Sequence, residues 1–176
     1  TGAFFKELLP PDRSRGNGRA DRSLLENLKE VRSRLRELGL SSDTCHDLLA
    51  RIIFVQFLFD RKDSQGVSAL NPNILSLWHG DGTLGQVHES FESILRSKSE
   101  TYRLFKKLDT LFNGDLFPGK DPDCGVTAEQ AWADEMDQVT PEHLNLLASL
   151  VSGSSDSRTG QFWLWREYSF DTIPLE

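Results

Sequence analysis

Residues 41–61, with the sequence SSDTCHDLLARIIFVQFLFDR, decide the fold class. The segment opens on Ser-Ser-Asp, residue types that cap the start of a helix, and we place the helix over residues 43–61. Its apolar side chains lie nearly all round the helix, which is typical of an element at the centre of a core. A strand over residues 52–59 is the alternative, but the length of the segment counted from its cap favours a helix.

A second amphipathic helix precedes this segment. Its apolar residues recur at helical spacing, and charged residues fill the opposite side. The apolar positions are Leu24, Leu25, Leu28, Val31, Leu35 and Leu38. Asp21 fits the N-cap of this helix, and Gly39 fits the glycine that follows a helix end.

Further helical patterns follow, separated by turns rich in Gly, Asn and Asp. Leu84 to Leu95 and Tyr102 to Phe112 each predict an amphipathic helix. A short helix is predicted over residues 127–135. Thr140 and Pro141 predict the start of a last helix, with Thr as its N-cap.

These patterns predict a mainly all-α fold, an irregular multi-helix bundle with long loops. The 176 residues correspond to about one domain, so we assign residues 1–176 to a single helical connector or scaffold domain. Thr1 is not an initiator Met, and the chain stops at Glu176 without a tail. We therefore expect a domain excised from a larger protein.

Composition narrows the class of protein. Hydrophobic residues make up 38% of the chain and charged residues 27%, which is typical of a globular domain and not of a disordered one. No apolar run approaches the roughly 20 residues that span a bilayer, and the first residues do not form a secretory signal. We expect a soluble, cytoplasmic protein without membrane contact.

The net charge of −7 is unevenly distributed. Residues 1–62 hold 12 Lys and Arg against 9 Asp and Glu, whereas the remaining residues hold 8 against 18. The acidic total argues against a free-standing nucleic-acid binder. A local contact with the DNA backbone is still expected in the basic part, and its candidates are Arg13, Arg15, Arg19 and Arg22.

Three arginines on the helix, Arg32, Arg34 and Arg36, are weaker candidates for phosphate contact. The alternative for all these arginines is a solubilising face, because acidic residues are interleaved with them. A coherent basic surface would favour a DNA role. Arginines paired with their own neighbours would favour a protein-interaction module.

Residues 80–85, GDGTLG, match the pattern G-x-G-x-x-G. A dinucleotide fingerprint must follow a strand and open a helix, so that backbone amides meet a pyrophosphate. The preceding residues 74–79 are a poor parallel strand, and no further βα units follow. A loop with a helix cap is the favoured interpretation, and a small nucleotide-binding enzyme is kept as an alternative.

No other constellation predicts a catalytic or metal site. The four histidines, none spaced for a metal motif, are expected on polar faces; they are His46, His79, His88 and His143. Cys45 is expected to be a buried, reduced thiol, and the absence of a Cys-x-x-Cys pair argues against zinc. Acidic residues around the loop 113–125 fit a solvated loop better than a carboxylate site. They are Asp109, Asp115, Asp121 and Asp123.

The C-terminal segment is rich in aromatic side chains that could stack on bases. Packing against a neighbouring domain is the more common use of such a cluster. We predict interdomain packing for Phe162, Trp163, Trp165, Tyr168 and Phe170.

Four stretches, taken together and in order, resemble the helical segment that precedes the catalytic domain of type IIG-like restriction-modification adenine-N6 DNA methyltransferases. In that family an FNGxLF turn and a Y-x-F-x-x-IP-x-E stretch lead into the methyltransferase domain; here they are FNGDLF and YSFDTIPLE. The stretches are Phe4–Leu9, Leu48–Arg61, Phe112–Pro118 and Gly160–Glu176.

The resemblance implies a scaffold and not an active site. The family's S-adenosylmethionine motif and its Asn-Pro-Pro-Tyr/Phe catalytic motif are missing, since residues 71–74 are Asn-Pro-Asn-Ile. No catalytic, cofactor-binding or metal residue is therefore carried over to this chain. S-adenosylmethionine is expected in the parent enzyme, and the expected partners are the rest of the methyltransferase chain and, for the parent, DNA.

Overall fold

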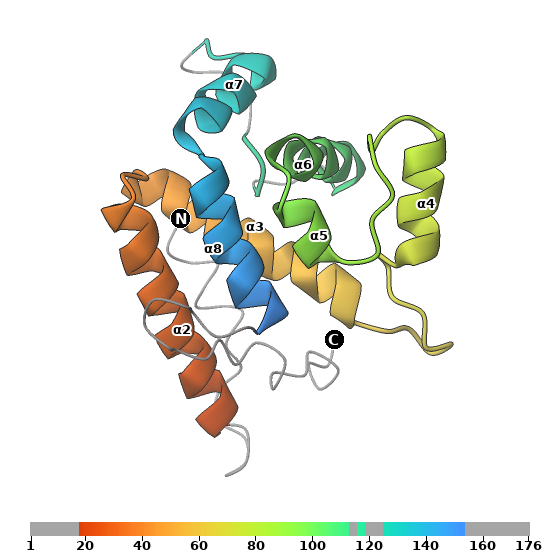
Figure 1. Ribbon diagram of the computed structural model, residues 1–176, viewed down its shortest axis with the longest axis horizontal. Coiled ribbons are helices and arrows are strands. Elements are labelled where there is room, and N and C mark those ends of the chain that lie inside the picture. The colour runs from red at the N-terminus through yellow and green to blue at the C-terminus, as the bar shows by residue number, and fades with distance from the viewer. Residues whose placement is uncertain (1–17, 113–115, 119–124, 154–176) are drawn as a thin grey trace.

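Helices make up most of the chain in the computed structural model, which describes residues 18–112, 116–118 and 125–153 (Figure 1). The predicted all-α class is confirmed, and no strand occurs within these ranges. In chain order the helices are α2 (Gly18–Glu37), α3 (Ser42–Asp60), α4 (Pro72–Gly80), α5 (Phe91–Leu95), α6 (Lys98–Phe112), α7 (Ala128–Gln138) and α8 (Pro141–Ser152).

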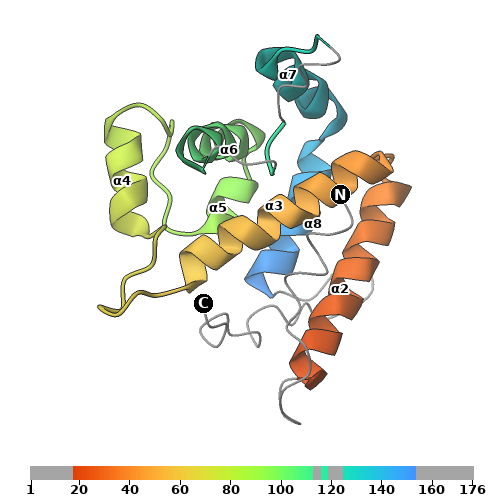
Figure 2. The ribbon, with the colours of Figure 1, turned by 180° about the vertical axis from the view of Figure 1, so that it is seen from behind.

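Helix α3 forms the centre of the core, as its all-round apolar pattern predicts. Seen from behind, it runs diagonally across the molecule from the side of α2 to the side of α4 (Figure 2). It packs against α2 and α5, and α8 covers α2 and α5 in turn. The Ser41 hydroxyl accepts from the Thr44 amide at 3.2 Å and caps the helix. The alternative of a strand over residues 52–59 is wrong.

Helix α2 ends as predicted, but its start differs from the prediction. Gly39 has φ +94°, and the amide of Leu40 donates to the Leu35 carbonyl, which closes a Schellman motif. Asp21 lies inside the helix and is not its N-cap, since the helix begins at Gly18.

Two leucines predicted on the buried face of α2 are exposed. Leu25 is 41% exposed and Leu38 is 44% exposed. Leu25 is about 100° around the helix from Leu24, outside the stripe that repeats every three or four residues. Leu38 follows the last helical residue, Glu37, so the helical spacing no longer determines its position.

The single amphipathic helix predicted over residues 84–95 is wrong. Only α5 is helical, and Val87, assigned to the buried face, is 63% exposed. Polar side chains hold the preceding residues in turns: Asp81 accepts from the Thr83 amide, and Ser90 caps α5 by accepting from the Ser93 amide. Such local bonds compete with helical hydrogen bonding.

The last two helices begin where their caps predict. Thr127 caps α7, which extends to Gln138 and is therefore longer than the predicted 127–135. Thr140 caps α8 in a capping box with His143. None of the described helices has both the length and the apolar character needed to cross a membrane.

Candidate functional site

A buried arginine in the middle of α3 forms the first of two polar networks. Arg51 is 1% exposed, and its two terminal nitrogens donate to the two carboxylate oxygens of Glu135 on α7, at 2.6 and 3.1 Å. The Tyr102 hydroxyl, on α6, donates to the same carboxylate at 3.0 Å. Burial, followed by the charge of Glu135, raises the pKa of Tyr102. The tyrosine therefore stays a neutral donor.

The rest of the Arg51 guanidinium is enclosed by backbone and rings. Its Nε donates to the Leu116 carbonyl at 3.0 Å. Its central carbon lies 4.9 Å from the ring centre of Phe105, 5.3 Å from that of Phe117 and 5.6 Å from that of Trp132. Every nitrogen of the guanidinium and both oxygens of Glu135 are bonded within the chain. This network holds α3, α6, α7 and residues 116–118 together and does not expose a catalytic group.

The sequence analysis did not single out Arg51 or Glu135. An arginine inside an apolar helix needs a partner, because a buried unpaired charge is strongly unfavourable. That rule could have identified Arg51. Glu135 is 84 residues away along the chain and resembles any exposed acidic residue of a short helix.

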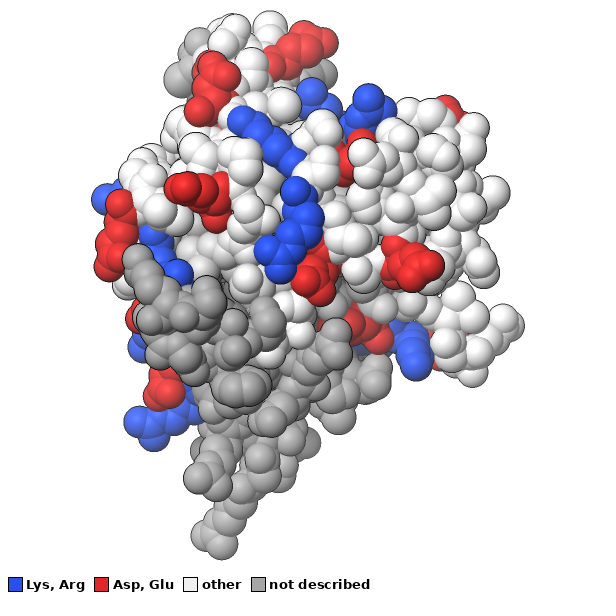
Figure 3. Space-filling view, viewed as in Figure 1, with Lys and Arg blue, Asp and Glu red and all other residues white. Residues whose placement is uncertain are grey.

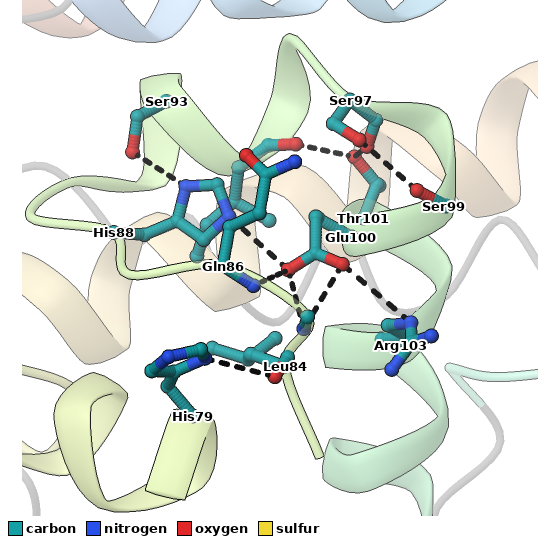
Figure 4. A network of polar contacts seen from close by, with 12 residues as sticks. His79, Leu84, Gln86, His88, Ser93, Ser97, Ser99, Glu100, Thr101 and Arg103 are labelled. Carbon is teal, nitrogen blue, oxygen red and sulfur yellow. Dashed lines mark hydrogen bonds and ion pairs between the residues drawn. The ribbon is translucent and has the colours of Figure 1, made fainter. Parts of the chain in front are cut away.

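A buried carboxylate on α6 forms the second network (Figure 4). Glu100 is 3% exposed. One of its oxygens accepts from the amides of Gly85 and Gln86 at 2.9 and 3.2 Å. His88 Nε2 lies 3.2 Å from the same oxygen, and Arg103 Nε lies 3.5 Å from the other.

Glu100 packs against the last glycine of the pattern at residues 80–85. A Cβ on Gly85 would lie 2.9 Å from the Glu100 carboxylate, so a larger residue there would require this carboxylate to shift. The residues that precede the loop form α4 and not a strand. The condition set for a dinucleotide fingerprint is not met, and the amides of Gly85 and Gln86 already bind a carboxylate of the chain itself.

Two of the four histidines differ from the prediction. His46 and His79 are exposed, but His88 and His143 are buried. His88 lies in the Glu100 network. His143 Nδ1 accepts from the Thr140 amide at 2.9 Å. No cluster of three His, Cys, Asp or Glu side chains within the described ranges could hold a metal ion.

Cys45 is buried, as predicted, and burial raises the pKa of its thiol. Arg32 and Arg36 oppose this shift only in part. We expect iodoacetamide at about pH 8 to alkylate Cys45 at least about 100-fold more slowly in the folded chain than in guanidinium, since reaction requires thiolate and an opening of the α2–α3 contact. Mass spectrometry of the peptide that contains Cys45 measures both rates. Equal rates would contradict this burial.

The candidate DNA-backbone contacts are only partly within the described residues. Arg13 and Arg15 lie outside them, and Arg19 lies in α2 with a side chain that the structure does not describe. Arg22 is exposed and forms an ion pair with Glu26 at 3.4 Å.

Two of the weaker candidates on α2 bind groups of the chain itself. Arg32 donates to His46 Nε2 at 2.8 Å, and Arg36 donates to the Leu40 carbonyl at 2.8 Å. The residues predicted to pack between domains lie outside the described residues, and so do three of the acidic loop residues. They are Phe162, Trp163, Trp165, Tyr168 and Phe170, and Asp115, Asp121 and Asp123.

Two of the stretches that carry the family resemblance meet in the fold. Arg51 of the stretch 48–61 binds the Leu116 carbonyl of the stretch 112–118, and the rings of Phe54 and Phe112 pack edge to face at 5.2 Å. Comparison of the chain with protein-family models, with curated proteins and with solved structures finds no match.

Proposed function

We propose that this chain is the non-catalytic helical domain of an adenine-N6 DNA methyltransferase or restriction-modification enzyme. In the parent it braces the domain that binds S-adenosylmethionine and contacts the DNA backbone. The observation that supports the proposal is the contact between two stretches of the resemblance, through the buried Arg51 and the Leu116 carbonyl. Two motifs that pack against each other are more specific than the same motifs scattered over a surface.

In the parent, the catalytic domain and this chain have different roles. S-adenosylmethionine supplies the methyl group, and the base is flipped out of the duplex before its N6 can react. The residues of this chain position the catalytic domain, with the segment 162–170 packing on it. Arg13, Arg15, Arg19 and Arg22 contact phosphates in this proposal.

The second candidate is a helical protein-interaction module without a nucleic-acid role. It is favoured by the α2 arginines, because Arg22 and Arg36 bind groups of the chain itself. It is also favoured by large apolar side chains on the surface, among them Leu77 and Leu111.

The reading frame beyond Glu176 and a methyl-transfer assay separate the two candidates. The longer protein is expressed, and transfer of a labelled methyl group from S-adenosylmethionine to duplex DNA is measured. We expect a downstream Asn-Pro-Pro-aromatic motif and label on adenine N6. A frame that stops soon after Glu176, or a longer protein without methyl transfer, would contradict the proposal and favour the interaction module.

A further inference from the structure

Helix α6 and the two residues before it carry several positive charges, although the chain after residue 62 is acidic overall. Residues 96–107 have the sequence RSKSETYRLFKK, with five basic residues and one acidic residue. We call the five side chains the basic band; they are Arg96, Lys98, Arg103, Lys106 and Lys107. In Figure 3, Lys and Arg side chains run from the upper part of the face to its middle, with acidic side chains beside them.

The only carboxylate of this stretch does not reach the surface. Glu100 points into the protein, where the amides of Gly85 and Gln86 and the ring of His88 surround it. On α6 itself the remaining acidic residue, Asp109, is half-buried. Arg103 reaches back to Glu100, with its Nε 3.5 Å from a carboxylate oxygen, whereas no exposed carboxylate of α6 lies beside Lys106 and Lys107.

The exposed residues of α6 share one face. Ser99, Arg103, Lys106 and Thr110 are exposed and recur at spacings of three or four residues, which places them along one side of the helix. Lys107 is half-buried beside them. These are residue types that contact phosphate oxygens in nucleic-acid complexes.

Aromatic rings lie under the two lysines. The Lys106 ammonium lies 5.9 Å from the ring centre of Trp132, and the Lys107 ammonium lies 5.7 Å from that of Trp78. Such contacts orient an aliphatic stem along the surface while the charged end stays in water. Three acidic side chains pair with members of the band: Asp81 lies 4.0 Å from Lys107, Glu92 pairs with Arg96 at 3.2 Å, and Glu100 lies 3.5 Å from Arg103. Lys98 donates to the Met136 carbonyl, and Lys106 is the member with only the ring of Trp132 beside it among these contacts.

We propose that the basic band is a docking surface for the phosphate backbone of duplex DNA. The occupant is inferred from charge complementarity, since the band is cationic within a chain of net charge −7, and from the Ser and Thr hydroxyls at both ends of the α6 face. The band contacts phosphates and carries no base readout. This inference rests on the proposed function and places its DNA contact on α6, in addition to the arginines before and within α2.

The test compares two variants that each lose two lysines. The variant Lys106→Gln/Lys107→Gln changes the band, and Lys29→Gln/Lys62→Gln removes the same charge from exposed lysines elsewhere. Fluorescence anisotropy measures binding of the full chain to a labelled duplex of about 20 base pairs over a salt series from about 50 to 200 mM. Thermal unfolding by circular dichroism checks that both variants are folded.

We expect the band variant to bind about tenfold more weakly and to lower the slope of log K against log salt by about two, while the control variant changes neither. Equal losses in the two variants would overturn the inference, because the effect would then follow net charge alone. Absence of binding by the unchanged chain would overturn it too. So would binding of a poly-glutamate peptide to the band in place of the duplex.

Failure of this inference and failure of the proposed function have different readouts. The proposed function is tested by methyl transfer in the longer protein, which needs no contact on α6. Methyl transfer without a change in salt slope would overturn the basic band as a DNA surface and leave the parent enzyme in place. A normal salt-slope effect without methyl transfer would overturn the methyltransferase and leave a backbone-binding module.

Discussion

Replacement of Arg51 by methionine is expected to lower the free energy of unfolding by about 3–5 kcal/mol, since it leaves the buried Glu135 carboxylate without its charge partner. The Leu116 carbonyl loses its donor as well. Urea unfolding followed by circular dichroism measures the effect. We expect the midpoint to fall and the dependence on urea to stay unchanged, because the loss concerns one network and not the whole core.

The matched control removes both charges. Arg51→Met/Glu135→Met exchanges the ion pair for apolar side chains, and such exchanges are often neutral or stabilising. The double variant should therefore be more stable than Arg51→Met alone. A single variant within about 1 kcal/mol of the unchanged chain would contradict the role given to this network.

Where the single variant is too unstable to purify, Tyr102→Phe provides a milder change. It removes one donor to Glu135 and keeps the charge pair and the ring packing. The expected loss is about 1–2 kcal/mol, the usual range for one buried hydrogen bond to a charged group. A loss near zero would mean that Tyr102 is not bonded to the carboxylate.

Helix starts and ends were predicted well where the deciding bonds are local. The Ser41 and Thr140 caps and the Gly39 turn each involve residues within a few positions of one another, so their residue types are sufficient. The start of α2 is an exception, because Gly18 and not Asp21 begins the helix. The preference of Asp for the N-cap position therefore does not determine where α2 begins.

The segment 81–90 could not be predicted from local pattern alone. Its apolar residues have helical spacing, but the amides of Gly85 and Gln86 bind a carboxylate on another element, Glu100. The same applies to Arg51 and Glu135. In both cases the deciding partner is separated along the sequence, and a periodicity argument contains no information about it.

The basic band is not evident when the charges of residues 1–62 and of the remaining residues are each summed. Residues after 62 have ten more acidic than basic residues, so the sequence analysis placed the DNA contact in the N-terminal arginines. The basic band can be recognised only once the structure shows that Glu100 is buried. The buried carboxylate pairs with Arg103 and leaves the charges of Lys106 and Lys107 on the outer side of α6.

Glu100→Ala is expected to cost about 2–4 kcal/mol of unfolding free energy, because two backbone amides and the buried ring of His88 lose their shared acceptor. Urea unfolding measures the loss. The control is Glu92→Ala, which removes an exposed carboxylate paired with Arg96 and should change the stability by less than about 1 kcal/mol. Equal effects of the two substitutions would contradict the burial of Glu100.

Hydrogen exchange gives this prediction a site-specific test. With Glu100 replaced by alanine, the amides of Gly85 and Gln86 should exchange more than about tenfold faster, beyond any change at the Leu144 amide of α8, which bonds to the Thr140 carbonyl. A uniform acceleration would indicate a general loss of stability. A selective one would mean that Glu100 holds residues 81–90 in their turns, through a carboxylate that also pairs with Arg103 of the basic band.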